Sequence, residues 1–594
     1  MKRTLKFAVL LCLIVIVMLF AVACDKNTNN PNQTTSEQTS SEETSSEETS
    51  PEGTSPEETL PQHVHAFGDW TLVTYPEPDK TGETLRVCAC GEKETQTIPA
   101  IGSAGLNYKV NDNGTCTITG IGTCTDTELV IPVAIDGCRV TKIGAFAFSG
   151  SQALTSVTML DNITEIELNA FENCNSLTSI TIPDSVTALG GWAVSGCDGI
   201  IQKENGVSYV GKWVIGCDRS VTSVVLRANT VGIVDYAFSN CSNLKSVTIP
   251  DSVRHISRDA FWRCDGPIQI ENGISYVDKW VIGCDESVTS AMLRENTVGI
   301  ADSAFFGCGL TSITIPDTVI AIGNSAFEQC GLTNITIPDS VTIIGDEAFY
   351  ACTNLTSVTI GNAVTTIGDY AFLNCDSLTS MTIPTSVSSI GYMAFYGCYS
   401  LASVSIYDIA AWCKIDFSNY AANPLSHARN LYLIKDNSSE LITDLRITDS
   451  VATIGDYAFW GCYSLTSVTI PASVAIIGDG TFQHCENLTS VAIPDSVINI
   501  GNSAFSNCTN LSSVTIGNSV TTIGEFAFSH CTNLASVTIG DSVTTIGEYA
   551  FFYCSNLTDV YYTGSEADWA KITIGSDNSY LIDANRHYNY VPEE

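Results

Sequence analysis

Four residues near the N-terminus have the types and the spacing of a metal site. His63 and His65 lie one residue apart, and Cys88 and Cys90 repeat that spacing. Between them, the stretches DWTLVTY and ETLRVCA flank a Pro/Gly/Asp-rich turn, so a hairpin-like fold brings the two ends together. Two imidazoles and two thiolates suit tetrahedral zinc, which would stabilise a module with a small core. The alternative is a β hairpin with exposed histidines and free thiols.

Most of the other cysteines recur in one phrase, and the sequence predicts that they pack rather than react. The phrase is IGDYAFLNC at 367–375, with close variants such as 454–462 and 523–531. Equivalent cysteines of neighbouring repeats would have Cβ atoms about 4.8 Å apart, beyond the roughly 3.5–4.5 Å typical of a disulfide. Single equivalent thiols do not form a tetrahedral metal cluster either. We therefore expect small, buried, reduced thiols at Cys174, Cys197, Cys241, Cys264, Cys308, Cys330, Cys352, Cys375, Cys398, Cys462, Cys485, Cys508, Cys531 and Cys554.

Catalytic chemistry finds little support in the sequence. The chain has seven histidines, and none lies in a motif that pairs a nucleophile with a base. His484 and His530 occupy the variable position before a repeated cysteine, which indicates surface side chains. Carboxylates such as Asp184 and Asp339 fall at turns of the repeat, where bonding to the local backbone is the default. We predict that the protein is not an enzyme.

The first residues predict export and attachment to a membrane. A basic start precedes an apolar run at 7–23, which ends in Ala-Val-Ala followed by Cys24. These are the parts of a secretory signal, and a cysteine directly after Ala-Val-Ala resembles the lipid-attachment site of bacterial lipoproteins. The alternative is an uncleaved membrane anchor, because the 17 residues of the run are just long enough to span a bilayer. Either arrangement places the rest of the chain outside the membrane.

Composition restricts the structure of the next segment and the class of partner. Residues 24–62 are rich in Ser, Thr, Glu and Pro, which predicts a disordered, extended stalk. The formal net charge of the whole chain is −38 at pH 7. A surface this acidic repels phosphate backbones, so we exclude nucleic acid as a partner.

From about residue 105 onward the chain is self-similar. The Phe of an Ala-Phe pair recurs mostly every 22 or 23 residues, a period typical of leucine-rich solenoids. In the unit 355–377, LTSVTIGNAVTTIGDYAFLNCDS, alternation predicts a strand, a turn, a second short strand and one helical turn capped by Asp369. One such rung cannot bury its apolar face alone, so we predict a stack of about fifteen rungs. The expected fold class is a leucine-rich-repeat-like solenoid, mainly parallel β, with short helical turns.

The repeated pattern LTSITIPDSVTxIGxxAFxxC resembles the BspA-type (Treponema-type) leucine-rich repeats of bacterial surface proteins. The resemblance extends over roughly residues 105–590, and the lead-in at 106–132 is similar to the usual start of such arrays. The module at 63–101 is similar to short His/Cys modules in surface proteins of Gram-positive anaerobes. The resemblance implies a cell-surface protein that binds host proteins, including components of the extracellular matrix.

Two departures from the regular repeat divide the array. Longer units at 204–233 and 271–300 each place an Asn-Gly turn before alternating residues, which predicts inserted hairpins near 200–220 and 267–287. A third segment, 407–440, echoes the C-terminal residues and predicts a cap-like unit kept inside the array. The expected organisation is a signal peptide at 1–23, a stalk at 24–62, a small β module at 63–101, a first solenoid block at 105–440 and a second block with a C-terminal cap at 441–594.

Two rows of side chains on the predicted surface are candidates for binding. Outward Ser and Thr residues such as Ser357 and Thr359 are explained by ordinary solvated β-structure. The aromatic residues directly after the Ala-Phe pair are predicted to project along one edge and to anchor a partner, with partial burial between rungs as the alternative. They are Trp262, Phe306, Tyr350, Tyr396, Trp460 and Phe552.

The sequence thus predicts a lipid-anchored protein on the outer face of a bacterial membrane, whose repeats bind an extracellular protein or glycan. No cofactor is expected for the solenoid, and the only candidate cofactor is a structural zinc in residues 63–101. The competing hypothesis is a passive spacer or envelope scaffold without a specific ligand.

Overall fold

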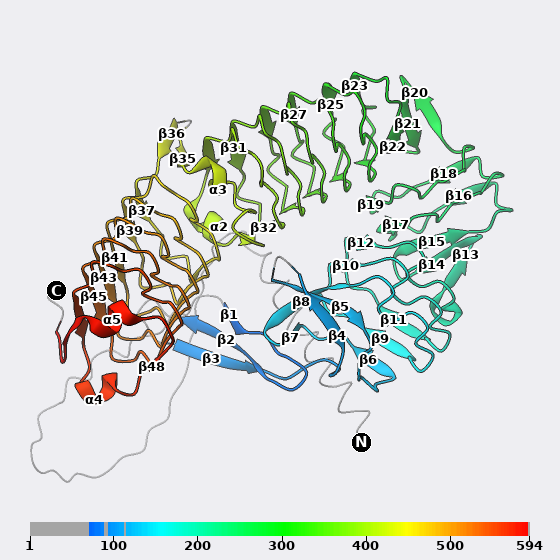
Figure 1. Cartoon of the computed structure of the whole chain (residues 1–594). Coiled ribbons are helices and arrows are strands. Elements are labelled where there is room, and N and C mark those ends of the chain that lie inside the picture. Colours follow the sequence, from blue (N-terminus) through cyan, green and yellow to red (C-terminus); the bar gives the residue numbers. More distant parts are fainter. Residues whose placement is uncertain (1–70, 88–92, 112–113, 437, 592–594) are drawn as a thin grey trace, which may run out of the picture. The chain divides into compact units, whose positions relative to one another are not determined.

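Each repeat folds into a rung with two short strands, and the strands of successive rungs pair in parallel (Figure 1). The computed structural model describes residues 71–87, 93–111, 114–436 and 438–591. Ser357 pairs with Ser380 in one row of strands, and Thr366 pairs with Ser389 in the other, both at a spacing of one repeat. This architecture confirms the predicted repeat solenoid of mainly parallel β-structure.

The first row of strands, called here the SVT row after its commonest sequence, carries the alternation seen in the sequence. Val358 is buried between exposed Ser357 and Thr359, because successive side chains of a strand point to opposite faces. Its strands are β6 (Glu128–Val130), β9 (Ser156–Thr158), β11 (Ser179–Thr181), β16 (Ser223–Val225), β18 (Ser246–Thr248), β23 (Ser290–Met292), β25 (Ser312–Thr314), β27 (Asn334–Thr336), β29 (Ser357–Thr359), β31 (Ser380–Ile383), β33 (Ser403–Ile406), β35 (Leu431–Lys435), β37 (Asp444–Arg446), β39 (Ser467–Thr469), β41 (Ser490–Ile493), β43 (Ser513–Ile516), β45 (Ser536–Ile539), β47 (Asp559–Tyr562) and β49 (Asn585–His587).

The second row, the TI row, consists of strands of two residues, of which the second residue is buried in nearly every case. Its strands are β10 (Glu165–Ile166), β12 (Ala188–Leu189), β17 (Gly232–Ile233), β19 (His255–Ile256), β24 (Gly299–Ile300), β26 (Ala321–Ile322), β28 (Ile343–Ile344), β30 (Thr366–Ile367), β32 (Ser389–Ile390), β34 (Asp416–Phe417), β38 (Thr453–Ile454), β40 (Ile476–Ile477), β42 (Asn499–Ile500), β44 (Thr522–Ile523), β46 (Thr545–Ile546) and β48 (Thr573–Ile574).

The segment between a TI strand and the repeated cysteine, called here the turn edge, is a series of tight turns. In residues 369–374 the backbone N–H groups use two kinds of acceptor. The N–H of Leu373 donates to the carbonyl of Tyr370, three residues back, whereas the N–H of Tyr370 donates to the carbonyl of Tyr392 in the next rung. Tyr370 and Asn374 have positive φ values of 57° and 59°, which close these turns. The predicted cap by Asp369 is wrong, because its Oδ1 accepts the N–H of Tyr392 in the next rung at 2.7 Å.

Two longer units insert antiparallel hairpins into the array. The first contains β13 (Gln202–Glu204), β14 (Val207–Val210) and β15 (Trp213–Cys217), and the second contains β20 (Gln269–Glu271), β21 (Ile274–Val277) and β22 (Trp280–Cys284). The last strand of each hairpin pairs in parallel with the next TI strand, β17 or β24. The hairpins therefore continue the TI row rather than lie outside it.

Short helices occur where the rung pattern is broken. Next to the first long unit lies a 3₁₀ helix, η1 (Asp198–Ile200), and the internal segment contains α2 (Ile409–Cys413), α3 (Leu425–Ala428) and the strand β36 (Ser438–Leu441). Trp412 is buried, and its Nε1–H donates to the Ala458 carbonyl at 2.7 Å, which joins this segment to the following rung. The end of the array contains α4 (Glu566–Trp569), which begins with a capping box of Ser565 and Asp568, and α5 (Ser579–Asp583).

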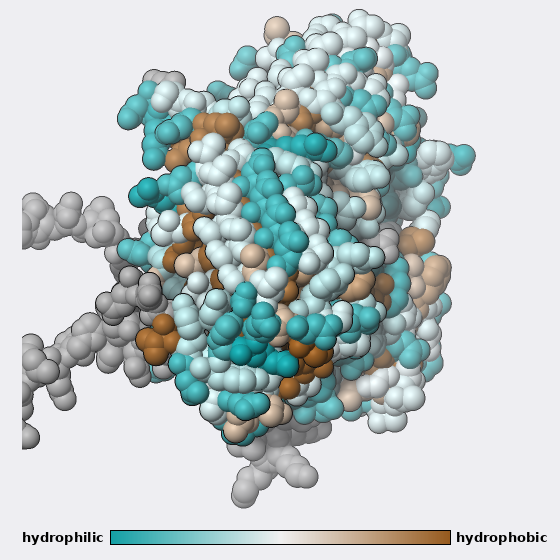
Figure 2. All heavy atoms as spheres, turned by 60° about the vertical axis from the view of Figure 1, so that its left-hand side comes forward, coloured by the Kyte–Doolittle hydropathy of each residue, from teal (hydrophilic) through white to brown (hydrophobic). Residues whose placement is uncertain are grey.

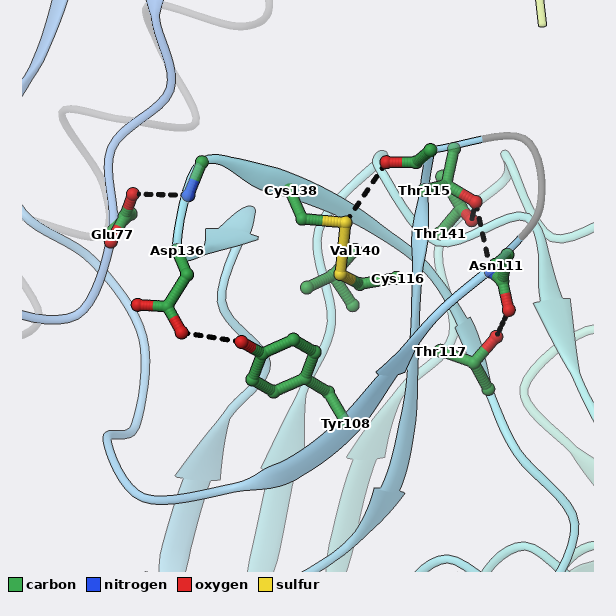
Figure 3. The surroundings of a disulfide bond; sticks show 12 residues. Glu77, Tyr108, Asn111, Thr115, Cys116, Thr117, Asp136, Cys138, Val140 and Thr141 are labelled. Atoms are coloured by element: carbon green, nitrogen blue, oxygen red, sulfur yellow. Dashed lines mark hydrogen bonds between the residues drawn. A yellow bond between two sulfur atoms is a disulfide. The ribbon is translucent and has the colours of Figure 1, made fainter. Parts of the chain in front are cut away.

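The start of the array differs from the rungs and contains a disulfide that the sequence analysis missed. β4 (Asn107–Val110), β5 (Cys116–Gly120), β7 (Ala134–Ile135) and β8 (Cys138–Ile143) belong to its first sheet. Cys116 lies opposite Val140, two residues from Cys138, and the two cysteines are bonded (Figure 3). Both cysteines lie outside the repeated phrase, so the prediction of free, buried thiols for that phrase does not apply to them.

The small module before the array contains three antiparallel strands rather than the two stretches expected. They are β1 (Thr71–Thr74), β2 (Gly82–Val87) and β3 (Lys93–Ile98), and the third was not predicted. Glu77 of this module accepts the backbone N–H of Gly137 at 2.8 Å, beside the Tyr108–Asp136 contact drawn in Figure 3. The module is therefore hydrogen-bonded to the first turns of the array.

Candidate binding surface

The turn edge is fixed from inside by a stack of aromatic rings. The Phe of each Ala-Phe pair is buried, and rings of neighbouring rungs are parallel, with centroids 5.3 Å apart for Phe372 and Phe395. Offset stacking of this kind contributes about 0.5–1.5 kcal/mol per pair beyond simple burial. Where the stack is continuous, as from Phe305 to Phe395, the residue after each Phe lies at an equivalent position on the outside of its rung.

The repeated cysteines fix the other end of the turn edge. All fourteen are free and buried, as expected. The thiol of Cys375 donates to the carbonyl of Phe349 in the preceding rung at 3.3 Å, and Cys398 repeats this bond with Phe372 at 3.2 Å. Burial raises the pKa of Cys352, Cys398 and Cys554 to about 12, so these side chains are neutral thiols at physiological pH. These three thiols are structural groups, since reactive cysteines have lowered pKa values.

A third set of contacts between rungs uses Asp and Asn. The Oδ1 of Asp346 accepts the N–H of Asp369, and that of Asp479 accepts the N–H of Asn502 at 2.6 Å. Asp339 at the other turn makes the same kind of bond to Asn362. Asp184 instead pairs with Lys212. The expectation that such carboxylates bond by default to their local backbone is therefore wrong for Asp339 and Asp184.

The predicted aromatic residues lie on the turn edge but form no single site. Trp262, Phe306 and Tyr396 are 48%, 39% and 40% exposed, whereas Tyr350 and Trp460 are half-buried. Trp460 contacts Tyr420 and His484, with ring centroids 5.0 and 5.1 Å apart. The turn edge therefore presents its aromatic residues in separate groups along the array.

Further aromatic residues on the same edge were missed. They occupy the first left-handed position of the turn edge, two residues before the Phe or, for Trp192, before Val194. The rings of Trp192 and Tyr236 stack there with centroids 4.7 Å apart. Phe526 and Tyr549 repeat this arrangement at 4.8 Å. The sequence does contain these aromatic residues, for example the Tyr of IGDYAF. Their outward position was not predicted, because an aromatic residue with positive φ is unusual and the sequence pattern predicts a helical turn there.

The two histidines predicted to be surface side chains, His484 and His530, are half-buried. His427 is half-buried as well, and burial lowers the pKa of His484 and His427. The Nε2 of His427 accepts the N–H of Gly397 at 3.2 Å, which requires the neutral ring. His484 and His427 therefore complete aromatic groups and are uncharged at pH 7.

Figure 2 shows one face of the molecule, on which hydrophobic atoms form small groups separated by hydrophilic ones. The array also has two open hollows of about 450 Å³ each, and Tyr407 lines both of them. One is bordered by Lys435 and Arg446, the other by Asp317 and Asp339. Neither hollow is lined by histidine or cysteine from the described residues, so neither holds a thiol or imidazole nucleophile.

The remaining predicted site residues lie outside the described part of the chain. These are the lipid-attachment candidate Cys24 and the zinc candidates His63, His65, Cys88 and Cys90. Across the ranges that the structure describes, no group of three or more His, Cys, Asp or Glu is arranged to hold a metal ion. In the same ranges, no helix combines the length and apolar character that crossing a membrane requires.

The stacked rungs, the two parallel rows and the tight turn edge define a leucine-rich-repeat solenoid. The sequence matches the family described as "BspA type Leucine rich repeat region (6 copies)" over residues 141–268, 215–332, 298–420 and 437–560. The matched residues make up more than half of the chain, which therefore belongs to this family.

Solved structures with similar chains come from several bacteria. A leucine-rich cell surface protein of Faecalibacterium prausnitzii is 25% identical, with 80% of this chain and 97% of that chain covered and a TM-score of 0.33. A leucine-rich repeat protein of Bacteroides ovatus is 22% identical, covering 82% and 98%, at a TM-score of 0.32. The pneumococcal vaccine antigen PcpA is 17% identical, covering 64% and 98%, at a TM-score of 0.32. No curated protein sequence matches this chain.

Proposed function

We propose that this protein is a cell-surface binding protein that attaches to an extracellular protein or glycan through the turn edge of its repeats. The observation that carries the proposal is the set of exposed aromatic residues on the turn edge, including Trp262, Phe306 and Tyr396, each of which directly follows a buried Phe. Aromatic side chains bury large areas at a small cost in conformational entropy and often dominate the energy of interfaces. The family supports a role in binding or scaffolding.

The test is saturable binding by the full-length chain. Beads coated with the purified protein are incubated with a panel of matrix proteins and glycans, and the triple variant Trp262→Ala/Tyr396→Ala/Trp460→Ala is measured beside it. A Ser357→Ala/Thr359→Ala variant on the SVT row serves as the matched control. We expect the aromatic variant alone to lose binding. Absence of saturable binding across the panel would instead favour the spacer or scaffold hypothesis, for which deletion should change envelope architecture.

Attachment to the membrane through lipid at Cys24 is part of the proposal. The supporting observation is the change from an apolar run to polar residues at this cysteine. Mass spectrometry of the mature N-terminus should find a lipidated Cys24, and processing should be sensitive to globomycin. An uncleaved N-terminus would show a spanning anchor instead.

A structural zinc in residues 63–101 is a further part of the proposal. His63, His65, Cys88 and Cys90 supply the ligand types of a structural zinc site. Elemental analysis of the purified protein should find about one zinc per chain, and Cys88→Ser should lower that content. Full zinc content in the variant would rule out this ligand set.

A further inference from the structure

Positive charge is confined to a few parts of this acidic chain. Ten of the 26 Lys and Arg residues fall within 203–294, whereas none occurs in 295–413 or in 447–570. Because charges more than about 10 Å apart are largely screened at physiological salt, an anionic partner responds to the local charge rather than to the net charge of −38. The same stretch also contains ten Asp and Glu residues, so it is formally neutral, and it repels an anion less than 295–413 and 447–570 do.

Several cations in this stretch are already used within the protein. Arg227 pairs with Glu204 at 2.7 Å and lies over the buried ring of Tyr209. Arg294 repeats this arrangement in the second long unit, and Lys279 pairs with Asp251. These side chains have structural roles because their charges are neutralised by neighbouring carboxylates.

Two arginines of the turn edge are different. Arg258 and Arg263 are exposed, and within the described residues neither is in direct ion-pair contact with a carboxylate, although Asp235 lies near enough for the charge of Arg258 to act on its pKa. The guanidinium carbon of Arg258 lies 5.3 Å from the ring centroid of Phe306, and that of Arg263 lies 5.5 Å from that of Trp262. Arg258, Trp262, Arg263 and Phe306, called here the Arg/aromatic patch, thus combine two exposed cations with two exposed aromatic rings.

We propose that the Arg/aromatic patch binds an acidic sugar unit of an extracellular glycan. A guanidinium donates two parallel hydrogen bonds to a carboxylate or a sulfate group, which lysine does not do. The apolar C–H face of the sugar ring packs on an exposed aromatic face, as other apolar groups do. This inference rests on the proposed binding function and assigns a ligand class to one part of the turn edge.

A glycan fits the patch better than an acidic peptide does. Anchoring side chains at protein interfaces fill pockets, and the hollows described above are not lined by any of the four residues. A sugar ring needs a flat aromatic surface and nearby charge, and both are present at Trp262 and Phe306. An acidic peptide of the same charge is therefore the outcome against which the glycan is tested.

The experiment measures binding of the full-length protein to defined probes. The probes are oligogalacturonate for carboxylates, heparin oligosaccharide for sulfates, a neutral mannan oligosaccharide, and poly-glutamate as the peptide. The test variant is Arg258→Gln/Arg263→Gln. The control variant, Arg219→Gln/Lys245→Gln, removes two exposed cations from the same stretch that lie next to the SVT row.

We expect one or both acidic oligosaccharides to bind to the wild type. The test variant should bind them about tenfold more weakly or worse, because it loses at least one bidentate hydrogen-bonded contact. The control variant should bind as the wild type does, and Trp262→Ala should also weaken binding. Which acidic probe binds distinguishes a carboxylate from a sulfate ligand. Unchanged thermal unfolding of the variants will show that the loss is not one of folding.

Three outcomes would overturn the inference. Equal binding of the neutral oligosaccharide, or equal loss in both double variants, would show that the patch is not a specific anion site. Arginine-dependent binding of poly-glutamate alone would replace the glycan by an acidic protein. Binding of other panel members that is independent of Arg258 and Arg263 would reject this ligand class and leave the proposed binding function standing, whereas no binding by any member would reject both.

Discussion

At the scale of the residue, the repeated cysteines act as hydrogen-bonded packing groups. A thiol is small enough for the crowded end of the turn edge, and it donates to a carbonyl of the rung before, as Cys375 does to Phe349. Serine would make the same bond but would bury a more polar group at greater cost. The position thus combines the two properties for which cysteine is suited, burial and weak donation.

The buried thiols predict that the protein loses stability at alkaline pH. The ordinary thiol pKa is 9.0, and burial raises that of Cys352, Cys398 and Cys554 to about 12. Between these values the unfolded chain releases protons that the folded chain retains, so the free energy of unfolding falls as pH rises. Each thiol contributes a loss of up to about 1.4 kcal/mol per pH unit.

Urea unfolding followed by circular dichroism at pH 7 to 11 measures this dependence. The Cys352→Ala variant is the control, because it removes one of the titrating groups and should flatten the slope by one thiol. Identical slopes for the wild type and the variant would show that the thiols are not responsible.

The Asp and Asn side chains between rungs predict a stabilising substitution. Burial raises the pKa of Asp479, whose Oδ1 accepts the N–H of Asn502. Asp479→Asn keeps the acceptor without the buried charge, as Asn502 and Asn324 do in their rungs. A raised carboxyl pKa means that the wild type loses stability as pH rises above the ordinary value of 3.8, and the variant should escape that loss.

Asp479→Ala is the matched variant and should be less stable than the wild type by about 1–2 kcal/mol, because the N–H of Asn502 is left without its acceptor. Denaturant unfolding of the three proteins at pH 7 and pH 4 compares them. A variant with Asn that is as unstable as the one with Ala would contradict this account.

At the scale of the element, each long unit depends on a close approach between a Trp and a Gly. Gly232 in β17 lies against the ring of Trp213 on the paired strand β15, and Gly299 lies in the same way against Trp280. A Cβ atom at either glycine would overlap the indole ring. The buried Trp and the small residue beside it together join a hairpin to a regular rung.

Gly232→Ala should therefore destabilise the protein by about 1–3 kcal/mol, because the indole has no space to move in a packed core. Gly216→Ala in the same unit is the control, since its Cβ would meet only Ser208 at an ordinary distance of 3.7 Å. The thermal unfolding midpoints of the two variants test this prediction. Equal midpoints would mean that the Trp213 side chain repacks freely around the added methyl group.

The rung could be predicted from sequence because its information is local. Alternation in SVTI and the spacing of Phe and Cys both repeat within 23 residues, and each has one physical meaning. The acceptor role of Asp369 could not be predicted, because its partner lies in the next rung and depends on how rungs stack. The burial of His484 against Trp460 and the contact of Arg258 with Phe306 likewise depend on neighbours one rung away.

At the scale of the whole molecule, charge is distributed very unevenly. Residues 295–413 and 447–570 contain acidic residues and no Lys or Arg, so repulsion between carboxylates is not relieved within those stretches. Among the described residues, Lys142 pairs with Asp369 and Lys571 with Asp568, but few other ion pairs join these stretches to a cation, and the rungs are held by packing and hydrogen bonds. A uniform excess of one charge destabilises a folded chain through self-repulsion.

The thermal unfolding midpoint should therefore rise with ionic strength, by several degrees between about 0.01 M and 1 M sodium chloride, as the Debye length falls from about 30 Å to 3 Å. Differential scanning calorimetry at constant pH measures the midpoint. A titration with sucrose gives the effect of an uncharged solute, and a midpoint that responds to sucrose but not to salt would rule out self-repulsion.

The contacts between rungs also determine how this chain would respond to force. Backbone pairs, the thiol of Cys375 and the Oδ1 of Asp369 each connect a rung to an immediate neighbour, and contacts between distant rungs, such as Lys142 with Asp369, are few among the described residues. Tension applied to the two ends would therefore detach rungs one after another, and each would release roughly 75 Å of slack at 3.3 Å per residue. Single-molecule stretching should give a regular series of small steps, the behaviour of a shock absorber whose travel is set by the number of rungs.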